Sequence, residues 1–327
     1  MKNILITGIT GQDGIFLTKL LINKYKKIHI VGTTRSYKSE ARFLRNLDYL
    51  GVEKNKLTKL DILKTNLNDY EKVSQFIKEF RPDYVYNFSG PSSVYESLKN
   101  PLMEIEIQKI FDNLTNSLIA NKNFCKFYQA SSSEMFKSSN NKLDENSPFY
   151  PTTPYSRAKL INHYKTIELR AKYNWEIYSG ITFNHESEFR KDEYLIMKII
   201  HNAISISNKN LKNFELGSTD LIRDWSYAED IVIGINKICE NGISGAYVIG
   251  RGIGNKISDI LDIVFNFFNL DWKKYVIIND SLLRENSPHE IISNPKKIQN
   301  ELGWRAKTDF ENMLIKIVNY KTKFYLE

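Results

Sequence analysis

Tyr155 and Lys159 stand four residues apart in the segment Tyr-Ser-Arg-Ala-Lys. Side chains at positions i and i+4 lie on the same face of a helix, so the lysine ammonium can lie beside the tyrosine phenol. A phenol with an unperturbed pKa of about 10 is a poor base at neutral pH, and lowering that pKa by about 3 units requires about 4 kcal/mol of preferential stabilisation of the phenolate. The ammonium and a second nearby cation can supply this stabilisation. The pair therefore predicts a tyrosine that accepts a proton from a substrate.

Ser132 and Glu134 lie about twenty residues upstream, in Ala-Ser-Ser-Ser-Glu. An apolar segment that ends at Gln129-Ala130 precedes them, so we expect both at the carboxyl end of a strand. Serines at the end of a strand are also common caps, and this alternative holds for each serine taken singly. Glu134 adds a second group that can transfer a proton, which simple alcohol oxidation does not require. The two segments together predict oxidation combined with a further proton-transfer step.

A glycine pattern at the N-terminus predicts a dinucleotide site. Gly8, Gly11 and Gly14 follow an apolar strand and open a helix, which is the context that this fingerprint requires. Glycine permits positive φ and close approach of a pyrophosphate, and the helix N-terminus offers free N–H groups and a positive dipole to the phosphates. The residues assigned to this site are Gly8, Gly11, Gln12, Asp13 and Gly14.

The end of the second predicted strand favours NADP over NAD. A carboxylate there would hold the ribose 2′-hydroxyl of NAD, whereas this chain has Thr34, Arg35 and Ser36. Two hydroxyls and a guanidinium suit a 2′-phosphate, although a solvated loop arginine is the alternative. Three further residues follow the third and fourth strands, where loops usually contact the adenine and the inner ribose: Asn66, Leu67 and Ser89.

Short apolar runs alternate with longer amphipathic stretches in the first half of the 327-residue chain. This alternation predicts an α/β fold with a doubly wound parallel sheet of the Rossmann type, whose strands end at one edge where ligands bind. The expected strands are 3–7, 28–32, 58–60, 84–88 and 126–129. The expected helices are 14–23, 70–79, 101–120 and 155–173.

The alternation is lost after residue 183, where Gly, Asn, Ser and Pro separate shorter elements. We therefore expect an NADP-binding domain at residues 1–183 and a smaller C-terminal substrate lobe at residues 184–327. Residues 226–250 contain a predicted helix at 226–240 and a predicted strand at 246–249, which we expect to return to the main sheet.

Composition excludes several functional classes. The net charge of +8 comes from lysines scattered along the chain without a dense basic run, so nucleic-acid binding is not predicted. No segment approaches the ~18 apolar residues of a membrane span. Cys125 and Cys239 lie in apolar segments without metal-ligand spacing, so we expect free thiols, no metal site and a reducing, cytoplasmic compartment.

These motifs together resemble those of the extended short-chain dehydrogenase/reductases and, more narrowly, of the GDP-mannose 4,6-dehydratase family. The resemblance spans almost the whole chain. It rests on the glycine pattern, Ala-Ser-Ser-Ser-Glu, the run from Pro148 to Lys159, Phe183-Asn-His-Glu-Ser187, Leu221-Ile-Arg-Asp-Trp225, and Leu283-Arg284 followed by Ser293-Asn-Pro-Lys.

The resemblance implies a role for each catalytic candidate. Tyr155 would remove the proton of the sugar 4-hydroxyl while hydride passes from C4 to NADP. Lys159 would hold the nicotinamide ribose and lower the tyrosine pKa. Glu134 would take the C5 proton and help water to leave from C6, and hydride returned to C6 would give a 4-keto-6-deoxy sugar. Ser132, where the family commonly has threonine, would hydrogen-bond O4 or the leaving hydroxyl.

The resemblance also implies a GDP-linked nucleotide sugar as substrate and a homodimer or homotetramer as the assembly. Guanidinium groups suit the diphosphate because they donate two parallel hydrogen bonds. The residues expected to contact the substrate are Ser92, Asn184, Lys198, Arg223 and Arg284.

Departures from the family pattern leave the hexose open. Pro91-Ser-Ser-Val94 stands where the family has Gln-Ser-His-Val, beside the expected hexose. Glu188-Phe-Arg190 replaces Pro-Arg-Arg, Asn66 replaces a common aspartate, and Glu285-Asn-Ser287 follows Arg284 where Arg-Pro-x-Glu is usual. GDP-mannose, GDP-N-acetylglucosamine and a GDP-heptose therefore remain candidates.

Two other functions fit part of the same pattern. A nucleotide-sugar epimerase or reductase of this fold would need the serine, tyrosine and lysine, but Glu134 would have no role in it. A non-catalytic NADP-binding sensor would need the glycine pattern alone, whereas Tyr155 and Lys159 are both present.

Overall fold

Seven parallel strands form the central sheet of the protein, in the order β11-β6-β5-β4-β1-β2-β3. The computed structural model describes residues 1–283 and 288–324. The chain runs outward from β1 to β3 and then continues from β4 on the other side of β1, so the sheet is doubly wound as predicted. The strands are β1 (Lys2–Thr7), β2 (Ile28–Thr34), β3 (Leu60–Lys64), β4 (Tyr84–Asn87), β5 (Lys126–Ser132), β6 (Ile177–Thr182) and β11 (Ala246–Ile249).

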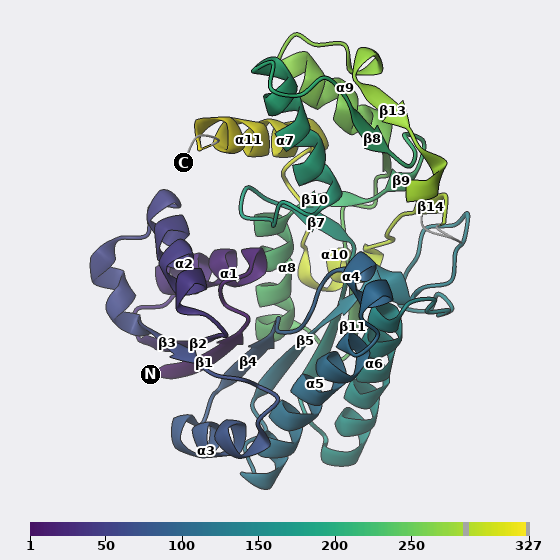
Figure 1. The fold of residues 1–327 in the computed structure, drawn as a ribbon. Coiled ribbons are helices and arrows are strands. Elements are labelled where there is room, and N and C mark those ends of the chain that lie inside the picture. The colour runs from purple at the N-terminus through teal and green to yellow at the C-terminus, as the bar shows by residue number, and fades with distance from the viewer. Residues whose placement is uncertain (284–287, 325–327) are drawn as a thin grey trace.

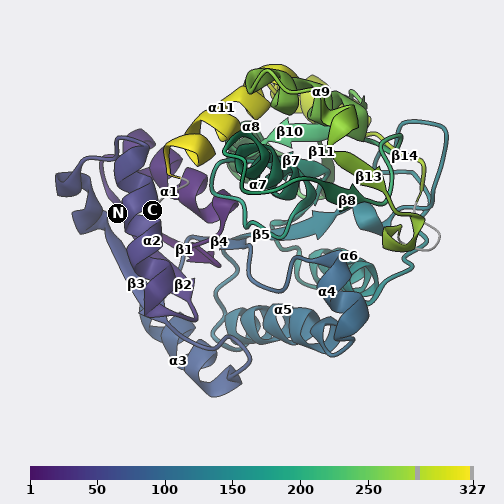
Figure 2. The ribbon, with the colours of Figure 1, turned by 45° about the horizontal axis from the view of Figure 1, so that its top comes forward.

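Helices cover both faces of this sheet, as Figure 2 shows. The strands alternate accordingly: Ile4, Ile6 and Tyr86 pack with α1 and α8, whereas Leu5 and Val85 pack with α3 and α5. Side chains of a strand point alternately to opposite faces, so a sheet covered twice is apolar on both. The helices of this layer are α1 (Gln12–Lys24), α2 (Tyr37–Tyr49), α3 (Tyr70–Phe80), α4 (Val94–Lys99), α5 (Met103–Ala120), α6 (Pro154–Tyr173), α8 (Ala228–Asn241) and α10 (Lys296–Leu302).

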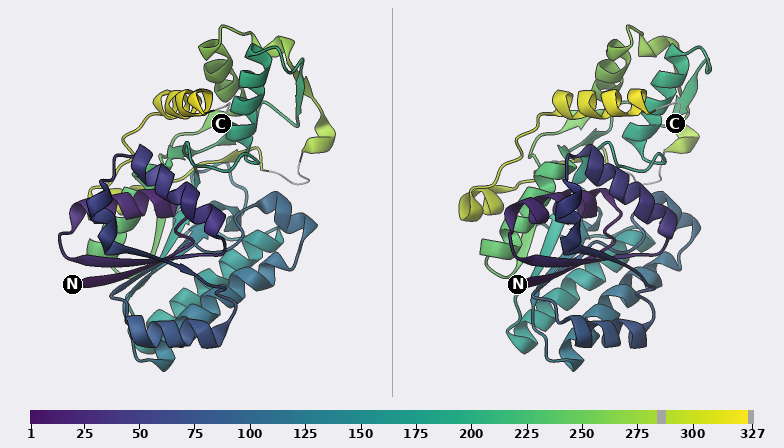
Figure 3. Two further views of the ribbon diagram at one scale, coloured as in Figure 1. Left: turned by 60° about the vertical axis from the view of Figure 1, so that its left-hand side comes forward. Right: turned by 90° about the vertical axis from the view of Figure 1, so that its left-hand side faces the viewer.

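A smaller group of elements stands over the carboxyl edge of the sheet (Figures 1 and 3). It contains α7 (Leu195–Ser207), α9 (Ile257–Phe267) and α11 (Phe310–Lys323). Its short strands form three small sheets, from β7 (Asn184–Glu186) with β10 (Trp225–Tyr227), β8 (Phe214–Leu216) with β13 (Val276–Ile278), and β9 (Ile222–Arg223) between β12 (Asn255–Lys256) and β14 (Glu290–Ile291). The chain leaves the sheet after β6, returns for α8 and β11, and leaves again. The domain boundary at residue 183 stays a proposal.

Two elements differ from the sequence-based expectation. The third strand starts at Leu60, after a 3-10 turn at Lys54–Lys59, and not at residue 58. It is an edge strand without a fully buried residue, so it lacks the apolar run that marks the other strands. Helix α2 lies in the gap between the second and third expected strands, for which no helix bounds were predicted. Its core contact comes from Phe43 and Leu47, which are both fully buried. Among the described residues, no helix is long and apolar enough to cross a bilayer.

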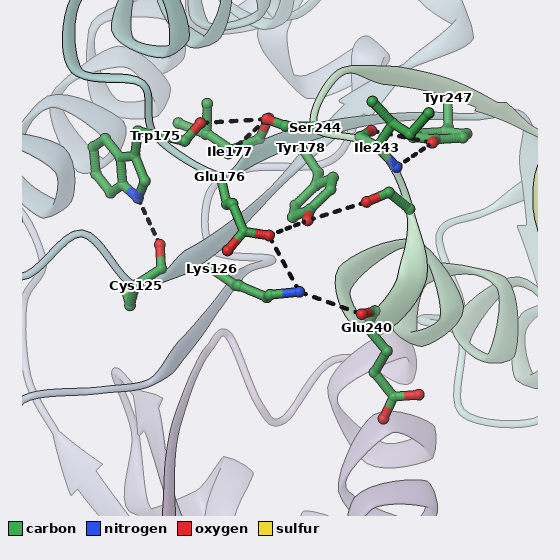
Figure 4. Close-up of polar contacts among 11 residues, drawn as sticks. Cys125, Lys126, Trp175, Glu176, Ile177, Tyr178, Glu240, Ile243, Ser244 and Tyr247 are labelled. Atoms are coloured by element: carbon green, nitrogen blue, oxygen red, sulfur yellow. Dashed lines mark hydrogen bonds and ion pairs between the residues drawn. The ribbon is translucent and has the colours of Figure 1, made fainter.

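Polar contacts fix the amino ends of β5 and β6 (Figure 4). Lys126 Nζ lies 3.2 Å from Glu176 Oε1 and donates to the carbonyl oxygen of Glu240, at the end of α8, at 3.3 Å. The Tyr178 hydroxyl donates to the same Glu176 oxygen at 3.1 Å, and Ser244 Oγ donates to the carbonyl of residue 177 at 3.0 Å. These contacts hold β5, β6 and the approach to β11 at the edge opposite the ligand-binding edge.

Gly180 is required by the packing between β5 and β6. A Cβ at this position would lie 1.9 Å from the hydroxyl oxygen of Tyr128, which is fully buried on the neighbouring strand. We expect Gly180→Ala to destabilise the protein by about 1–3 kcal/mol or more through overpacking. Gly245→Ala is the matched control, because its Cβ would meet nothing closer than 3.7 Å. Chemical denaturation followed by circular dichroism measures both, and equal midpoints for the two variants would contradict this account.

Candidate active site

A cavity of about 920 Å³ opens between the carboxyl edge of the sheet and the smaller group of elements. Cavities of this size hold drug-sized ligands. Its walls come from the end of β5, the loop after β4, the start of α6, the segment from β7 to α7, and the turn before residue 284. Ligands of doubly wound proteins bind at this edge, near the point where the strand order reverses.

The four catalytic candidates, Ser132, Glu134, Tyr155 and Lys159, all line this cavity. Strand β5 ends at Ser132, whose Oγ accepts from the backbone N–H of Glu134 at 3.3 Å. Helix α6 starts at Pro154 behind a reciprocal cap between Thr153 and Ser156. Tyr155 therefore lies in its first turn, with Lys159 one turn further along the same face.

Burial is the largest influence on the pKa values of Tyr155 and Lys159. It raises the pKa of Tyr155 to about 12, against the opposing effects of the Ser132 hydroxyl and of Arg190. It also lowers the pKa of Lys159 to about 8, against the opposing charge of Asp13. Lys159 Nζ donates to the carbonyl of residue 130 at 2.8 Å and lies 5.6 Å from the Tyr155 ring centroid. The expectation was that Lys159 lowers the pKa of Tyr155. The side chains around Tyr155 do not by themselves bring this pKa below its ordinary value.

The glycine loop has the form that a diphosphate requires. Gly8 has φ of +66°, and a Cβ on Gly14 would lie 2.3 Å from the carbonyl oxygen of Ile9. Gly11 is the N-cap residue of α1 and has no side chain that could accept from the first N–H groups of this helix. The loop and the helix end therefore fit the phosphates of a dinucleotide.

The side chains of the first turn of α1 contact β7 and the residue after it. Gln12 donates from Nε2 to the carbonyl of His185 at 2.9 Å and accepts from Ser187 Oγ at 2.8 Å. Asp13 lies 3.1 Å from His185 Nε2. Burial alone would lower the pKa of His185, but the Asp13 charge outweighs it and the pKa is raised. The same pairing lowers the pKa of Asp13 despite burial. The pair therefore lies at the cavity wall, where each side chain favours the charged form of the other.

Sequence reasoning assigned no role to His185, Arg190 or Tyr194, which all line the cavity. The Arg190 guanidinium lies 3.5 Å from the centroid of the Tyr194 ring, and its Nε lies 3.4 Å from Glu186 Oε2. The Tyr194 hydroxyl lies 2.8 Å from Ser92 Oγ. The only signal in the sequence was the block that begins at Asn184, since the contact between Tyr194 and Ser92 joins residues 102 positions apart.

The other cofactor candidates lie at the carboxyl ends of β2, β3 and β4, outside the lining of this cavity. Arg35 is 74% exposed and its Nη1 lies 3.0 Å from Glu106 Oε1. Asn66 Oδ1 accepts from the backbone N–H two residues later at 3.1 Å. Leu67 is buried, and the Ser89 N–H donates to Thr7 Oγ1 at 3.2 Å. Their cofactor contacts stay predictions.

Some of the substrate candidates line the cavity and others do not. Ser92, Asn184 and Arg223 line the cavity. Arg223 is nearly buried, and its Nη1 donates to the carbonyls of residues 222 and 289. Lys198 lies outside the cavity lining and donates to the carbonyl of residue 215 at 3.2 Å. Arg284, the fifth candidate, lies outside the described residues.

A family model described as GDP-mannose 4,6 dehydratase matches residues 5–317. The chain belongs to the GDP-mannose 4,6-dehydratase family. GDP-mannose 4,6 dehydratase 2 of Arabidopsis thaliana is 28% identical over 326 residues, covering 97% of this chain and 86% of the relative. The resemblance inferred from the motifs is thereby confirmed over nearly the full length.

Solved structures show the same fold at lower sequence identity. DesIV, the dTDP-glucose 4,6-dehydratase of Streptomyces venezuelae with NAD and TYD bound, has a TM-score of 0.85 at 18% identity, covering 98% of this chain and 97% of that chain. The UDP-glucose 4-epimerase of Thermotoga maritima has a TM-score of 0.83 at 19% identity and covers 99% of both chains. Dehydratases and epimerases thus share this architecture, and the fold alone does not separate the two activities.

A buried histidine connects α6 to β6 and, through β6, to β5, the strand that ends at Ser132. In this family member, His163 Nδ1 lies 2.8 Å from Ser179 Oγ, which lies 3.0 Å from Ser131 Oγ. Burial lowers the pKa of His163 from 6.5 to about 4. The neutral ring therefore supports the helix face that holds Tyr155 and Lys159.

Because folding lowers the pKa of His163, its neutral form stabilises the protein above pH 6.5, and this contribution is lost as the pH falls towards 4. Between pH 7.5 and 4.5 we expect the wild type to lose about 2–3 kcal/mol more unfolding free energy than His163→Gln. Urea denaturation of both proteins across this range measures the difference. Parallel pH profiles would show that the histidine is not held neutral by the fold.

Proposed function

We propose that the protein is a GDP-hexose 4,6-dehydratase that uses NADP and forms the 4-keto-6-deoxy sugar. Membership of the GDP-mannose 4,6-dehydratase family over nearly the whole chain supports this activity. The observation that carries the proposal is the position of Glu134 in the same cavity as Tyr155, close enough for its charge to raise the tyrosine pKa. A carboxylate and a phenol of one cavity can therefore act on the same sugar.

Each of these groups has a defined proton to move. Tyr155 accepts the O4 proton, and the Ser132 hydroxyl, at the end of β5, hydrogen-bonds O4. Glu134 removes the proton at C5, which a ketone at C4 makes acidic, and delivers it to the C6 hydroxyl as water leaves. The proton held by Tyr155 returns to C5. NADP, when bound, supplies reversible acceptance of the hydride from C4 and its return to C6. The balance is loss of one water from the hexose.

The site's residues fit a nicotinamide dinucleotide. The glycine loop and the uncapped N-terminus of α1 would hold the diphosphate, with His185 and Arg190 as nearby cations. Lys159 would hold the nicotinamide ribose. Arg35 and the Thr34 hydroxyl would hold the 2′-phosphate, so we propose NADP. The exposed position of Arg35 at the end of β2 supports this assignment.

We propose that the nucleotide diphosphate is held by Asn184 and Arg223 in the cavity, and that Lys198 and Arg284 also contact the substrate. Arg223 suits this role because its side chain is nearly buried, which strengthens a guanidinium–phosphate pair.

We also propose a cytoplasmic homodimer or homotetramer. Both cysteines are buried free thiols, which suits a reducing compartment. Apolar side chains are exposed from α4 to the start of α5 and on the outer face of α6, and a second copy of the chain would cover them. They are Tyr95, Leu98, Leu102, Ile105, Tyr164 and Ile167.

Replacing Glu134 by glutamine separates dehydration from the other activities of this fold. We expect Glu134→Gln to lower kcat for the 4-keto-6-deoxy product about 10²–10⁴-fold, because the amide cannot take the C5 proton. Cofactor binding should change less than about twofold, since the substitution removes a charge but no volume. Mass spectrometry of the products and fluorescence titration with NADPH measure the two quantities.

Glu71→Gln, an exposed substitution on α3, is the control for that experiment. Unchanged dehydration by Glu134→Gln would exclude its role as the base. An epimerised GDP-hexose as the product of the wild type would instead support the epimerase alternative.

Removing the Arg35 guanidinium tests the choice of cofactor. We expect Arg35→Ala to weaken NADP binding by about tenfold or more, because a charge-assisted hydrogen bond contributes about 1.5–3 kcal/mol. NAD lacks the 2′-phosphate, so its dissociation constant should change less than about twofold. Isothermal titration calorimetry with both cofactors measures the ratio. Equal losses for NADP and NAD would place Arg35 outside the 2′-phosphate site.

A further inference from the structure

A hydrogen bond between Ser92 and Tyr194 joins two walls of the cavity. Ser92 lies in the loop that follows β4, and Tyr194 is the N-cap residue of α7, which belongs to the smaller group of elements. Their hydroxyl oxygens are 2.8 Å apart, and both residues line the cavity. The bond therefore links the sheet edge to the opposite wall within reach of a bound sugar.

The surroundings of Tyr194 favour it as the donor in this bond. The Arg190 guanidinium lies 3.5 Å from its ring centroid, and a cation on the face of a phenol draws electron density from the ring. This makes the phenol hydrogen more positive and strengthens its donation to Ser92. A Ser92 oxygen that accepts from Tyr194 has its own hydrogen free to donate elsewhere, and hydrogen bonds in such a chain reinforce one another.

Few oxygens of the hexose can accept the hydrogen of the Ser92 hydroxyl, because most of them already have an assigned partner. This step rests on the proposed function, in which Tyr155 and Ser132 act on O4, Glu134 acts at C5 and C6, and the diphosphate occupies C1. Besides the ring oxygen O5, which is bonded to the reacting C5, the oxygens that remain on the pyranose are O2 and O3. Pro91 and Ser93 flank Ser92 where the family has glutamine and histidine. Pro91 has no polar side chain, and Ser93 Oγ accepts from the N–H of Glu96 as the N-cap of α4.

We propose that Tyr194 is a positioning residue that directs the Ser92 hydroxyl to donate to O2 or O3 of the hexose, and that this chain thereby selects a GDP-hexose carrying oxygen at that carbon. If the contacted oxygen is O3, the site accepts both a 2-hydroxy sugar and a 2-acetamido sugar. If it is O2, the 2-acetamido sugar is disfavoured.

Deoxy substrates test this inference. The GDP-hexose that the wild type converts fastest is compared with its 2-deoxy and 3-deoxy analogues, for the wild type, Tyr194→Phe and Ser92→Ala. We expect each variant to lose about three- to tenfold in kcat/KM on the parent hexose, as the loss of one neutral hydrogen bond implies. On the analogue that lacks the contacted oxygen, the wild type and both variants should have equal kcat/KM.

Controls separate this role from a structural one. Ser92→Thr keeps the hydroxyl and should retain most of the activity, and Tyr70→Phe makes the same change as Tyr194→Phe on α3, outside the cavity. Equal losses of Tyr194→Phe on the parent hexose and on both analogues would overturn the proposal, and so would no loss on the parent hexose.

A failure of the proposed dehydratase function can be distinguished from a failure of the role proposed for Tyr194. A wild type that converts no GDP-hexose would refute the dehydratase assignment. The same comparison made with dissociation constants for the parent GDP-hexose and its two analogues, by calorimetry, would still decide the role of Tyr194. Loss of affinity confined to substrates that carry the contacted oxygen would support it, and any other pattern would refute it.

Discussion

Burial of the titratable side chains at the carboxyl edge of the sheet is the constraint on which the proposed chemistry of this protein depends. Burial acts in opposite directions on two side chains of the cavity: it raises the pKa of the Tyr155 phenol and lowers the pKa of the Lys159 ammonium. A buried site also strengthens each charge that remains, so Asp13, His185 and Arg190 affect their neighbours more than they would in water. In the proposed reaction, proton removal by Tyr155 therefore depends on charge that bound molecules bring into the cavity.

Much of this arrangement was predictable from the sequence because it is local. A glycine pattern between a strand and a helix, and a tyrosine and a lysine one turn apart, fix short-range geometry wherever they occur. Since parallel strands end at one edge, the separate motifs at Gly8, Ser132 and Tyr155 were expected at the same edge of one sheet. The doubly wound order of the strands follows from the same alternation.

The rest depends on contacts between distant parts of the chain. Gln12 and Asp13 were read as cofactor residues, but their side chains meet residues more than 170 positions away. No spacing predicts that Tyr194 contacts Ser92, or that Lys198 lies outside the cavity lining, because tertiary packing decides both. The edge strand β3 was misplaced because none of its residues is fully buried, and a weakly buried strand has little apolar pattern to read.

The return of the chain to the sheet, through α8 and β11, limits how this architecture can be recombined. A cut after β6 would leave Tyr178 and its neighbours without the strand and helix that cover them. The unpaired edge of β6 would then be open to pairing with other molecules. A chimaera that exchanges the sugar-recognising half must therefore be spliced at several junctions, and variation in substrate is easier to obtain from point changes in the cavity wall than from fusion of whole segments.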